Sequence, residues 1–419
     1  MANKVLFFYL LTCPIYWLPG LDPIFIKYFK ITLISFVFLL FALRYKFTFI
    51  IPREGKHLFL VLVIWSFPFL WISYPNHEIS MVVIYYLNYF FGLFALVFSY
   101  SVYDKLLEAK SAYRILFFLV SIISILPITN FLYNIPDITS PFSDSLDYEE
   151  LGYFWSTGFH GSRTGWSIAL SQFIPLGLLF ISRDYGRGLK IRKLFYFLLV
   201  LTPIFGAQIV CMGRGGLFSS AISILIIIYK YFDRKVFFTF LSSLILIMFI
   251  YSNDILIALR FASDDGRSFT IEEATSSRDV LIKQAPELIF ESPVFGNGFK
   301  GSARSSFGIA EFGESLEVHN VFIRIIVDHG VIFSMVMIFF IFSLIVLAIR
   351  VLWKNDAPTL VVVASCIILS GVFSANFEPN TIFGNFQNLP LWWFSAGLLL
   401  KYSEGFNPKS QRGLNKINY

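Results

Sequence analysis

The sequence predicts an all-α membrane protein whose chain crosses the bilayer many times. Hydrophobic residues make up 57% of its 419 residues and charged residues only 14%, which is too little charge to cover a soluble protein of this size. Apolar runs recur along the chain, each of a length that crosses a bilayer as a helix. Because these runs lack alternating polarity, they exclude a membrane β-barrel.

The apolar windows predict about twelve transmembrane helices. The first window follows Lys4 and resembles a signal peptide, but Trp17–Asp22 offers no small-residue cleavage site, so we expect a retained helix. The windows cover residues 5–21, 29–43, 57–73, 80–101, 114–133, 165–182, 194–211, 215–231, 236–252, 331–349, 358–376 and 385–400.

The charge pattern predicts that both ends of the chain lie in the cytoplasm. With the N-terminus inside, about two thirds of the 33 lysine and arginine residues fall in cytoplasmic segments. The reverse orientation would invert the positive-inside rule, and an even number of spans returns the C-terminus to the cytoplasm. The cationic clusters lie at 44–56, 105–114, 183–193, 230–235 and 350–354.

This topology divides the chain into four parts. Residues 1–252 are expected to hold nine helices and an outer loop at 134–164. Residues 253–330 form a large outer loop between the ninth and tenth spans, with amphipathic helices. Residues 331–402 hold the last three spans, and residues 403–419 form a polar cytoplasmic tail.

Composition and motifs exclude several other classes. The net charge of +6 does not predict nucleic-acid binding, because the cations lie between apolar spans. Cys13, Cys211 and Cys366 are odd in number and form no CxxC pair, which predicts neither a disulfide framework nor a metal site. The sequence has no GxxxxGKS/T, HExxH or Asp-x-Asp motif, so we expect no ATP-driven transport, no metal and no cofactor.

The first candidate site is the turn Gly213–Gly216 between two apolar helices. Arg214 occupies a membrane boundary, where an arginine is costly unless it is paired, snorkels or faces a wet cavity. Gly213 and Gly215 leave room for a large anion at the backbone, and the start of the following helix favours negative charge. We expect Arg214 to contact an anion, with an interfacial anchor as the alternative.

Arg163 stands in a similar setting. It lies among glycines in the stretch Gly158–Trp166, directly before another apolar run. An interfacial anchor, supported by Trp166, is again the alternative. Together with Arg214, this residue predicts two arginine-bearing helix starts on one membrane face.

Within the large outer loop, Arg278 opens a stretch with helical spacing of apolar residues. Val280, Leu281 and Leu288 are spaced as in an amphipathic helix that lies on the membrane face. The turn-rich stretch Ser292–Gly298 follows it. A solvated helix face is the alternative for Arg278 taken alone.

A histidine marks the end of this loop. His319 and Asn320 precede an apolar helix that we expect to begin near Val331. A histidine at the outer boundary can accept a proton near neutral pH, as a general base must, and a hydrogen-bonded structural role is the alternative. His329 is a second candidate, but about three helical turns separate it from His319, so the two side chains should not touch.

In this order, the segments resemble the O-antigen ligase and polymerase superfamily of bacterial envelope glycosyltransferases. The resemblance covers about residues 158–330 at the level of motifs and the remainder by the number of spans. Asp328 departs from the family pattern, in which glutamate is common, and Phe322 or Ile323 stands where leucine is expected. The matching residues are Gly213–Gly216, Arg278, Pro293–Gly298, His319–Asn320 and Gly330.

The resemblance implies a GT-C-like fold in the bacterial inner membrane, with an active site that faces the periplasm. The donor substrate is then a glycan on undecaprenyl diphosphate. Arg214 and Arg278 are expected to bind the diphosphate and stabilise the leaving group, and His319 to orient or deprotonate the acceptor hydroxyl. Four further residues are expected to bind substrate: Arg163, Gly213, Gly215 and Asn320.

Polymerases and ligases share this constellation. We favour an O-antigen polymerase, which transfers the growing glycan to the next lipid-linked repeat, because Arg163 offers a second cationic site for a second lipid diphosphate. A ligase acting on anionic lipid A–core is the alternative. A flippase would carry charged residues in the middle of its spans and two sequence halves that resemble each other, and we find neither in the sequence. A purely structural role leaves the outer arginines unexplained. The expected partners are membrane lipid, a chain-length regulator and a flippase.

Overall fold

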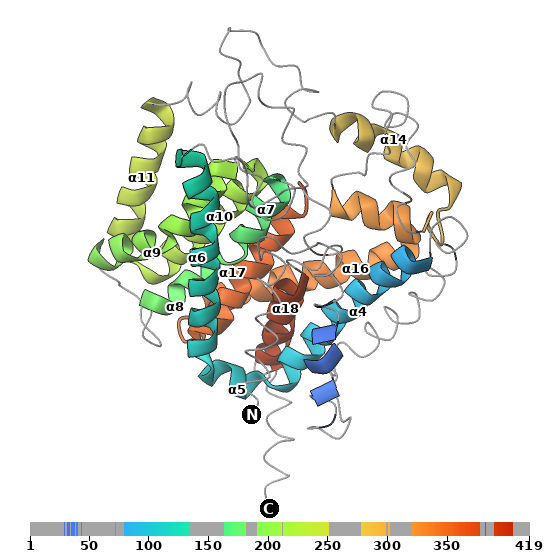
Figure 1. Cartoon of the computed structure of the whole chain (residues 1–419), viewed down its shortest axis with the longest axis horizontal. Coiled ribbons are helices and arrows are strands. Elements are labelled where there is room, and N and C mark those ends of the chain that lie inside the picture. The colour runs from blue at the N-terminus through green and yellow to red at the C-terminus, as the bar shows by residue number, and fades with distance from the viewer. Residues whose placement is uncertain are drawn as a thin grey trace, which may run out of the picture.

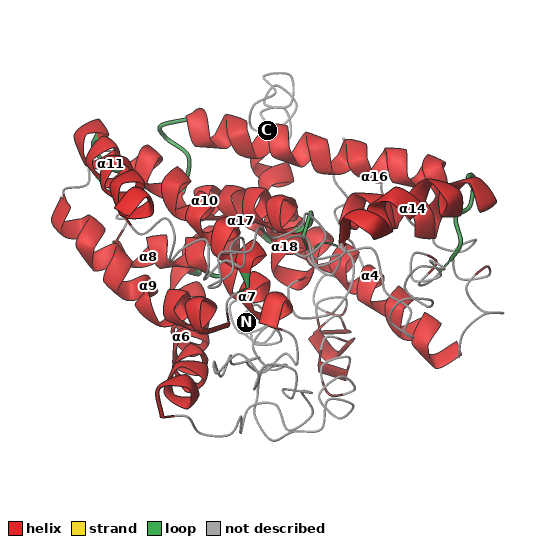
Figure 2. Ribbon diagram, turned by 90° about the horizontal axis from the view of Figure 1, so that it is seen from above, coloured by secondary structure: helices red, strands yellow, loops and turns green. Residues whose placement is uncertain are grey.

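The chain folds into a bundle of helices (Figures 1 and 2). In this computed structural model, every regular element of the described residues is a helix, which confirms the all-α class. The described residues are 79–133, 163–181, 191–211, 213–250, 278–298, 320–377 and 389–404, with isolated positions between 29 and 72 and at 301 and 382.

Apart from α16, the helices that correspond to predicted windows from residue 79 onwards follow those windows within a few residues, and most of the first three windows lies outside the described residues. The bounds are α4 Ile79–Ser101, α5 Tyr103–Glu108, α6 Lys110–Tyr133, α7 Arg163–Ser171, the 3₁₀ helix η5 Ile174–Gly177, α8 Leu178–Ile181, α9 Ile191–Cys211, α10 Arg214–Tyr231, α11 Arg234–Ile250, α14 Arg278–Glu291, α16 Val321–Trp353, α17 Thr359–Ser374 and α18 Leu389–Glu404.

Four helical stretches in these ranges are long and apolar enough to cross a membrane. Two shorter apolar helices, Phe90–Ser101 and Thr359–Ser374, accompany them. The membrane character predicted from composition is therefore supported by the fold. The four stretches are Lys110–Thr129, Thr164–Ile181, Ile191–Cys211 and Val321–Trp353.

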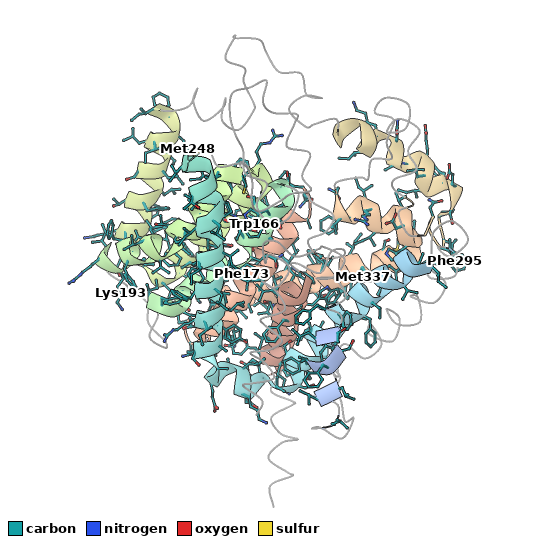
Figure 3. All side chains as sticks on the ribbon, in the orientation of Figure 1. Trp166, Phe173, Lys193, Met248, Phe295 and Met337 are labelled. Atoms are coloured by element: carbon teal, nitrogen blue, oxygen red, sulfur yellow. The ribbon has the colours of Figure 1, made fainter. Side chains whose placement is uncertain are left out.

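The second of these stretches is interrupted in the middle. After α7 ends at Ser171, the backbone tightens into η5 around Pro175 and then continues as α8. Proline lacks the amide hydrogen of a regular helical turn, which accounts for the break. Trp166 and Phe173 are fully buried on either side of Ser171 and lie at the centre of the bundle (Figure 3).

The helix α16 differs most from the sequence expectation. It begins at Val321 rather than near Val331, and Gly330 (φ 80°, ψ 169°) divides it into two limbs. The first limb, residues 321–329, carries polar residues that weaken its hydropathy signal. Two of them, Arg324 and Asp328, form a buried ion pair at 3.2 Å, one helical turn apart, and so satisfy each other within the helix.

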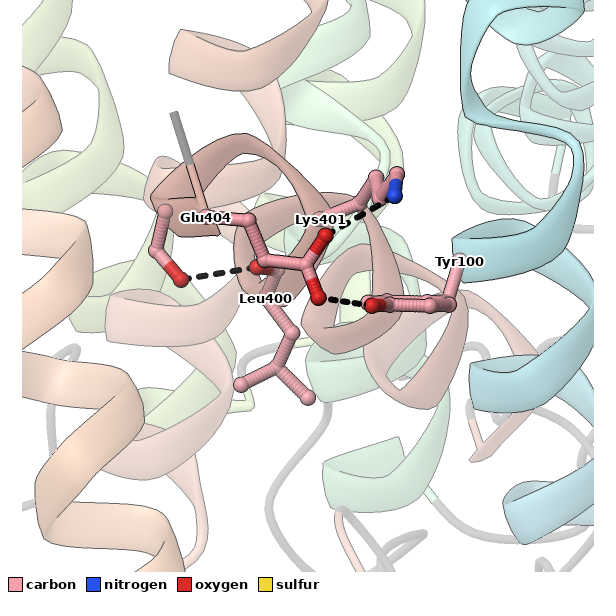
Figure 4. A network of polar contacts seen from close by, with 5 residues as sticks. Tyr100, Leu400, Lys401 and Glu404 are labelled. Atoms are coloured by element: carbon pink, nitrogen blue, oxygen red, sulfur yellow. Dashed lines mark hydrogen bonds and ion pairs between the residues drawn. The ribbon is translucent and has the colours of Figure 1, made fainter. Parts of the chain in front are cut away.

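The last helix, α18, packs mainly on α4. A Cβ atom at Gly397 would meet Ser99 and the carbonyl oxygen of Leu96, so glycine permits this close approach. At the end of both helices, the Tyr100 hydroxyl donates to Glu404, which also accepts from Lys401 at 2.8 Å (Figure 4). The Lys401 ammonium lies 4.9 Å from the centre of the Tyr100 ring.

Contacts between helix ends define two opposite ends of the bundle. At one end, Arg114 at the start of α6 donates to the Leu179 carbonyl at 2.7 Å, and Lys230 at the end of α10 donates to the Leu352 carbonyl at 2.8 Å. The start of α10 and the start of α16 lie at the other end. By the positive-inside rule we expect the first end to face the cytoplasm, which stays a prediction.

Candidate functional site

Three helix starts that bear predicted site residues gather around the last turn of α17. The Ser167 hydroxyl of α7 donates to the carbonyl oxygen of Gly213 at 2.9 Å. The amide of Val321 donates to the carbonyl oxygen of Ala375 at 2.9 Å. Figure 1 shows α7, α10 and α17 side by side at the centre of the bundle. We call this gathering of the starts of α7, α10 and α16 with residues 375–377 the composite mouth.

Gly213 and Arg214 form the start of α10. Gly213 has an extended backbone (φ −80°, ψ 92°), and its carbonyl oxygen accepts from the amides of Gly216 at 3.0 Å and Leu217 at 3.1 Å. Arg214 is the first helical residue and is half-buried. Its charge therefore adds to the positive end of the helix dipole, which is an arrangement that favours an anion.

The two following glycines make room for neighbouring helices. A Cβ atom at Gly215 would stand 3.0 Å from Phe377 Cβ and 3.2 Å from Ile168 Cδ1. At Gly216 it would collide with the backbone and hydroxyl of Ser167. Both glycines are buried, so their small size serves the approach of α7 and α17 to α10.

A buried polar network that the sequence did not predict joins α7, α9 and α10. The Gln208 side-chain amide of α9 donates to the Ser167 carbonyl at 2.7 Å, and its oxygen accepts from the Ser220 hydroxyl at 2.8 Å. These three residues join α7, α9 and α10 and are fully buried. A glutamine inside an apolar run is the signal that could have pointed to the network, because such a group needs partners in a membrane interior.

Arg163 lies at the start of α7, and the structure describes its backbone only. It precedes Ser167 by one helical turn, and Ser167 contacts the Gly213 turn. The two predicted arginine-bearing helix starts therefore belong to adjoining helices.

Arg278 lies at the start of α14, which confirms the predicted helix there. The far end of α14 is fastened to the kink of α16, where the Asn297 amide donates to the Val327 carbonyl at 2.8 Å and Val331 to Pro293 at 2.8 Å. Figures 1 and 2 show α14 beside the first limb of α16. The structure describes only the backbone of Arg278, and these hydrogen bonds hold the opposite end of α14, so the described residues show no contact between Arg278 and the composite mouth.

Two glycines allow this fastening. Gly296 (φ 75°) and Gly330 (φ 80°) both adopt the left-handed backbone region that favours glycine. A Cβ atom at Gly330 would collide with the Val294 carbonyl, and one at Gly296 with the Asp328 carbonyl. The turn-rich stretch predicted at Ser292–Gly298 therefore serves as the clasp between α14 and α16.

Asn320 caps α16. Its side-chain oxygen accepts from the amides of Phe322 at 3.0 Å and Ile323 at 3.2 Å, as an N-cap residue does. The family resemblance predicts substrate binding for Asn320 and gives no sign of this structural role. The preceding residue, His319, lies outside the described residues.

The second histidine candidate lies in the interior. His329 is buried at the α16 kink, and its ring stacks on Phe333 with 4.7 Å between ring centres. This placement suits a packing role better than contact with an acceptor hydroxyl.

The described part of the site is suited to holding an anion. Three helix starts carry partial positive charge, and Arg214 adds a full charge at one of them. Among the residues that the structure describes, no cluster of three histidine, cysteine or acidic side chains could hold a metal ion. No protein-family model matches the chain, and no curated protein matches it in sequence.

Proposed function

We propose that this chain is a bacterial inner-membrane glycosyltransferase that transfers a glycan from undecaprenyl diphosphate at the periplasmic face. The composite mouth is the single observation that carries the proposal. It brings the helix starts of Arg163, Arg214 and Asn320 to one end of a membrane-type bundle. The proposal includes about twelve spans and a GT-C-like architecture.

In the proposed reaction, the acceptor hydroxyl displaces the diphosphate at the sugar carbon. His319 takes the hydroxyl proton as the new carbon–oxygen bond forms. The bond between the sugar carbon and the phosphate oxygen breaks, and the diphosphate leaves with the electron pair. Arg214, Arg278 and the positive helix ends stabilise the charge on this leaving group, and direct displacement inverts the stereochemistry.

We favour a polymerase over a ligase. A polymerase holds two lipid diphosphates at once, and the composite mouth offers two adjoining arginine-bearing helix starts for them. A ligase that transfers the glycan to lipid A–core would use the same donor site, and a lipid-linked glycan flippase is the less favoured alternative.

Deletion of the gene, followed by gel analysis of the surface polysaccharide, separates these functions. We expect loss of a polymerase to leave lipid A–core with a single repeat. Loss of a ligase would leave bare core, with long polymer held on the carrier lipid. Unchanged ladders would contradict both.

Point variants test the site itself. We expect Arg214→Ala and His319→Ala to reproduce the deletion, because they remove the anion contact and the proton acceptor. Arg192→Ala is the matched control, since Arg192 is an exposed arginine in the first turn of α9 at the other end of the bundle. Wild-type ladders from a well-expressed His319→Ala protein would remove His319 from the mechanism.

A further inference from the structure

A groove at the other end of α10 from the composite mouth is lined mainly by apolar side chains. Its volume is about 520 Å³, within the range of roughly 300–1,000 Å³ that small-molecule sites occupy. Four helices, α10, α11, α16 and α17, contribute to its walls. The side chains that matter here are Ile226, Tyr229, Phe237, Leu241, Ile349 and Trp353.

The helix α11 forms the outer wall and leaves the groove open towards the bilayer. None of its residues is buried, and it stands at the left edge of the bundle in Figure 1. Phe238 is 60% exposed and Phe249 is 78% exposed, which suits a helix surrounded by lipid. An occupant that enters between α10 and α11 therefore needs an apolar chain.

The rim of the groove places it at the membrane–water boundary. Tyr229 is 70% exposed and Trp353 is 82% exposed, and both lie near the ends of their helices. Exposed tyrosine and tryptophan at helix ends are typical of the headgroup level of a bilayer. An occupant with its chain in the groove would have its polar group at this rim.

Positive charge predominates at the same rim. Lys230 lines the groove, and its ammonium donates to the Leu352 carbonyl at 2.8 Å and the Lys354 carbonyl at 2.6 Å. Asp233 and Asp356 are the acidic residues of these helix ends. The cations outnumber them, which favours an anionic headgroup. They are Arg234, Lys235, Arg350 and Lys354, whereas the Lys230 ammonium is already occupied by the carbonyl oxygens at the end of α16.

We propose that this groove binds an anionic phospholipid. An acyl chain lies between α10 and α11, against Ile226 and Leu241, and the phosphate lies at the cationic rim. Arg234 and Lys235 open α11 and are exposed, and they lie three and two residues before Phe237 in the groove wall. The proposal requires the membrane setting of the bundle and is independent of the transfer reaction.

Native mass spectrometry of the purified full-length protein tests this proposal. We expect dioleoyl phosphatidylglycerol to be retained more strongly than dioleoyl phosphatidylcholine, because the two lipids differ only in the headgroup. The double variant Arg234→Ala/Lys235→Ala should weaken phosphatidylglycerol binding by roughly tenfold or more, since each cation near a lipid headgroup contributes about fivefold.

A matched pair of cations on another helix serves as the control. Arg192 and Lys193 are also adjacent and exposed in the first turn of an apolar helix, α9, and Lys193 points away from the bundle in Figure 3. Arg192→Ala/Lys193→Ala should leave phosphatidylglycerol binding unchanged. Ile226→Trp fills the groove and should reduce retention of both lipids.

Three results would overturn the proposal. Equal retention of both lipids by the wild-type protein would remove the headgroup preference. Equal losses in the two double variants would mean diffuse attraction to a cationic surface. Unchanged binding in a folded Ile226→Trp protein, with its thermal unfolding as the check, would place the lipid outside the groove.

Discussion

At the scale of single residues, Asn320 links the stability of a helix to the proposed site. Its side-chain oxygen caps α16 at 3.0 Å and 3.2 Å, and it directly follows His319 in the sequence. Asn320 therefore caps α16 in addition to the substrate-binding role that the sequence predicts for it. Substitutions can separate the two roles.

We expect Asn320→Ala to lower the free energy of unfolding by about 1 kcal/mol, because the capping bonds are lost. Thermal unfolding in detergent measures this change. Asn320→Asp retains a capping oxygen and should unfold like the wild type, yet its negative charge should repel the diphosphate and shorten the polysaccharide ladder. Equal unfolding temperatures for the alanine and aspartate variants would contradict the capping role.

The sequence could predict which residue types the site contains but not which partners they have. Arg214 was found because an arginine is conspicuous beside apolar spans. The role of Gly216 could not be predicted, because a glycine in a turn gives no sign that Ser167 of another helix will pack against it. Contacts between residues distant in sequence leave no local pattern.

At the scale of elements, the contact between α7 and α10 positions Arg214. Gly216 lies against the Ser167 backbone, and the Ser167 hydroxyl bonds to the Gly213 carbonyl. The network through Gln208 holds α9 in the same arrangement. The spacing of these helices therefore depends on the smallest side chain at position 216.

We expect Gly216→Ala to push α7 away from α10 and to reduce polysaccharide synthesis strongly, because the added methyl group would collide with backbone rather than with a flexible side chain. The length of the polysaccharide ladder measures the effect. Gly206→Ala in α9 is the control, since its methyl group would meet only the end of the Ile128 side chain at 3.0 Å. Equal ladders for the two variants would show that the spacing is unimportant.

Helix positions could be predicted well where apolar runs were continuous. The windows at 215–231 and 358–376 match α10 and α17 within a few residues. The start of α16 could not be predicted in this way, because Arg324 and Asp328 break the apolar run. Their ion pair satisfies both charges inside the helix, which a hydropathy window does not register.

At the scale of the whole molecule, the contacts between helix ends fix which ends share a side. Lys230 of α10 contacts the end of α16, and Tyr100 of α4 contacts Glu404 of α18. From the charge pattern we expect that side to face the cytoplasm. This assignment came from the sequence, whereas the grouping of the ends came from the fold.

Reporter fusions test the assignment. We expect green fluorescent protein joined after Glu404 to fluoresce, because the end of α18 should lie in the cytoplasm. Alkaline phosphatase joined after Glu291, at the end of α14, should be active, because that segment should lie in the periplasm. The opposite pair of results would invert the topology and exclude a periplasmic site.

The contact of Lys230 with the end of α16 has a consequence for how α10 and α16 are held together. Its ammonium sits on the carbonyls of Leu352 and Lys354, where the helix carries roughly half a negative charge. The cation neutralises the negative end of the second limb of α16, and the carbonyl oxygens in turn replace the water that the buried ammonium has lost. Each helix end therefore satisfies the other, and removal of the Lys230 charge would leave the last carbonyl oxygens of α16 without this donor.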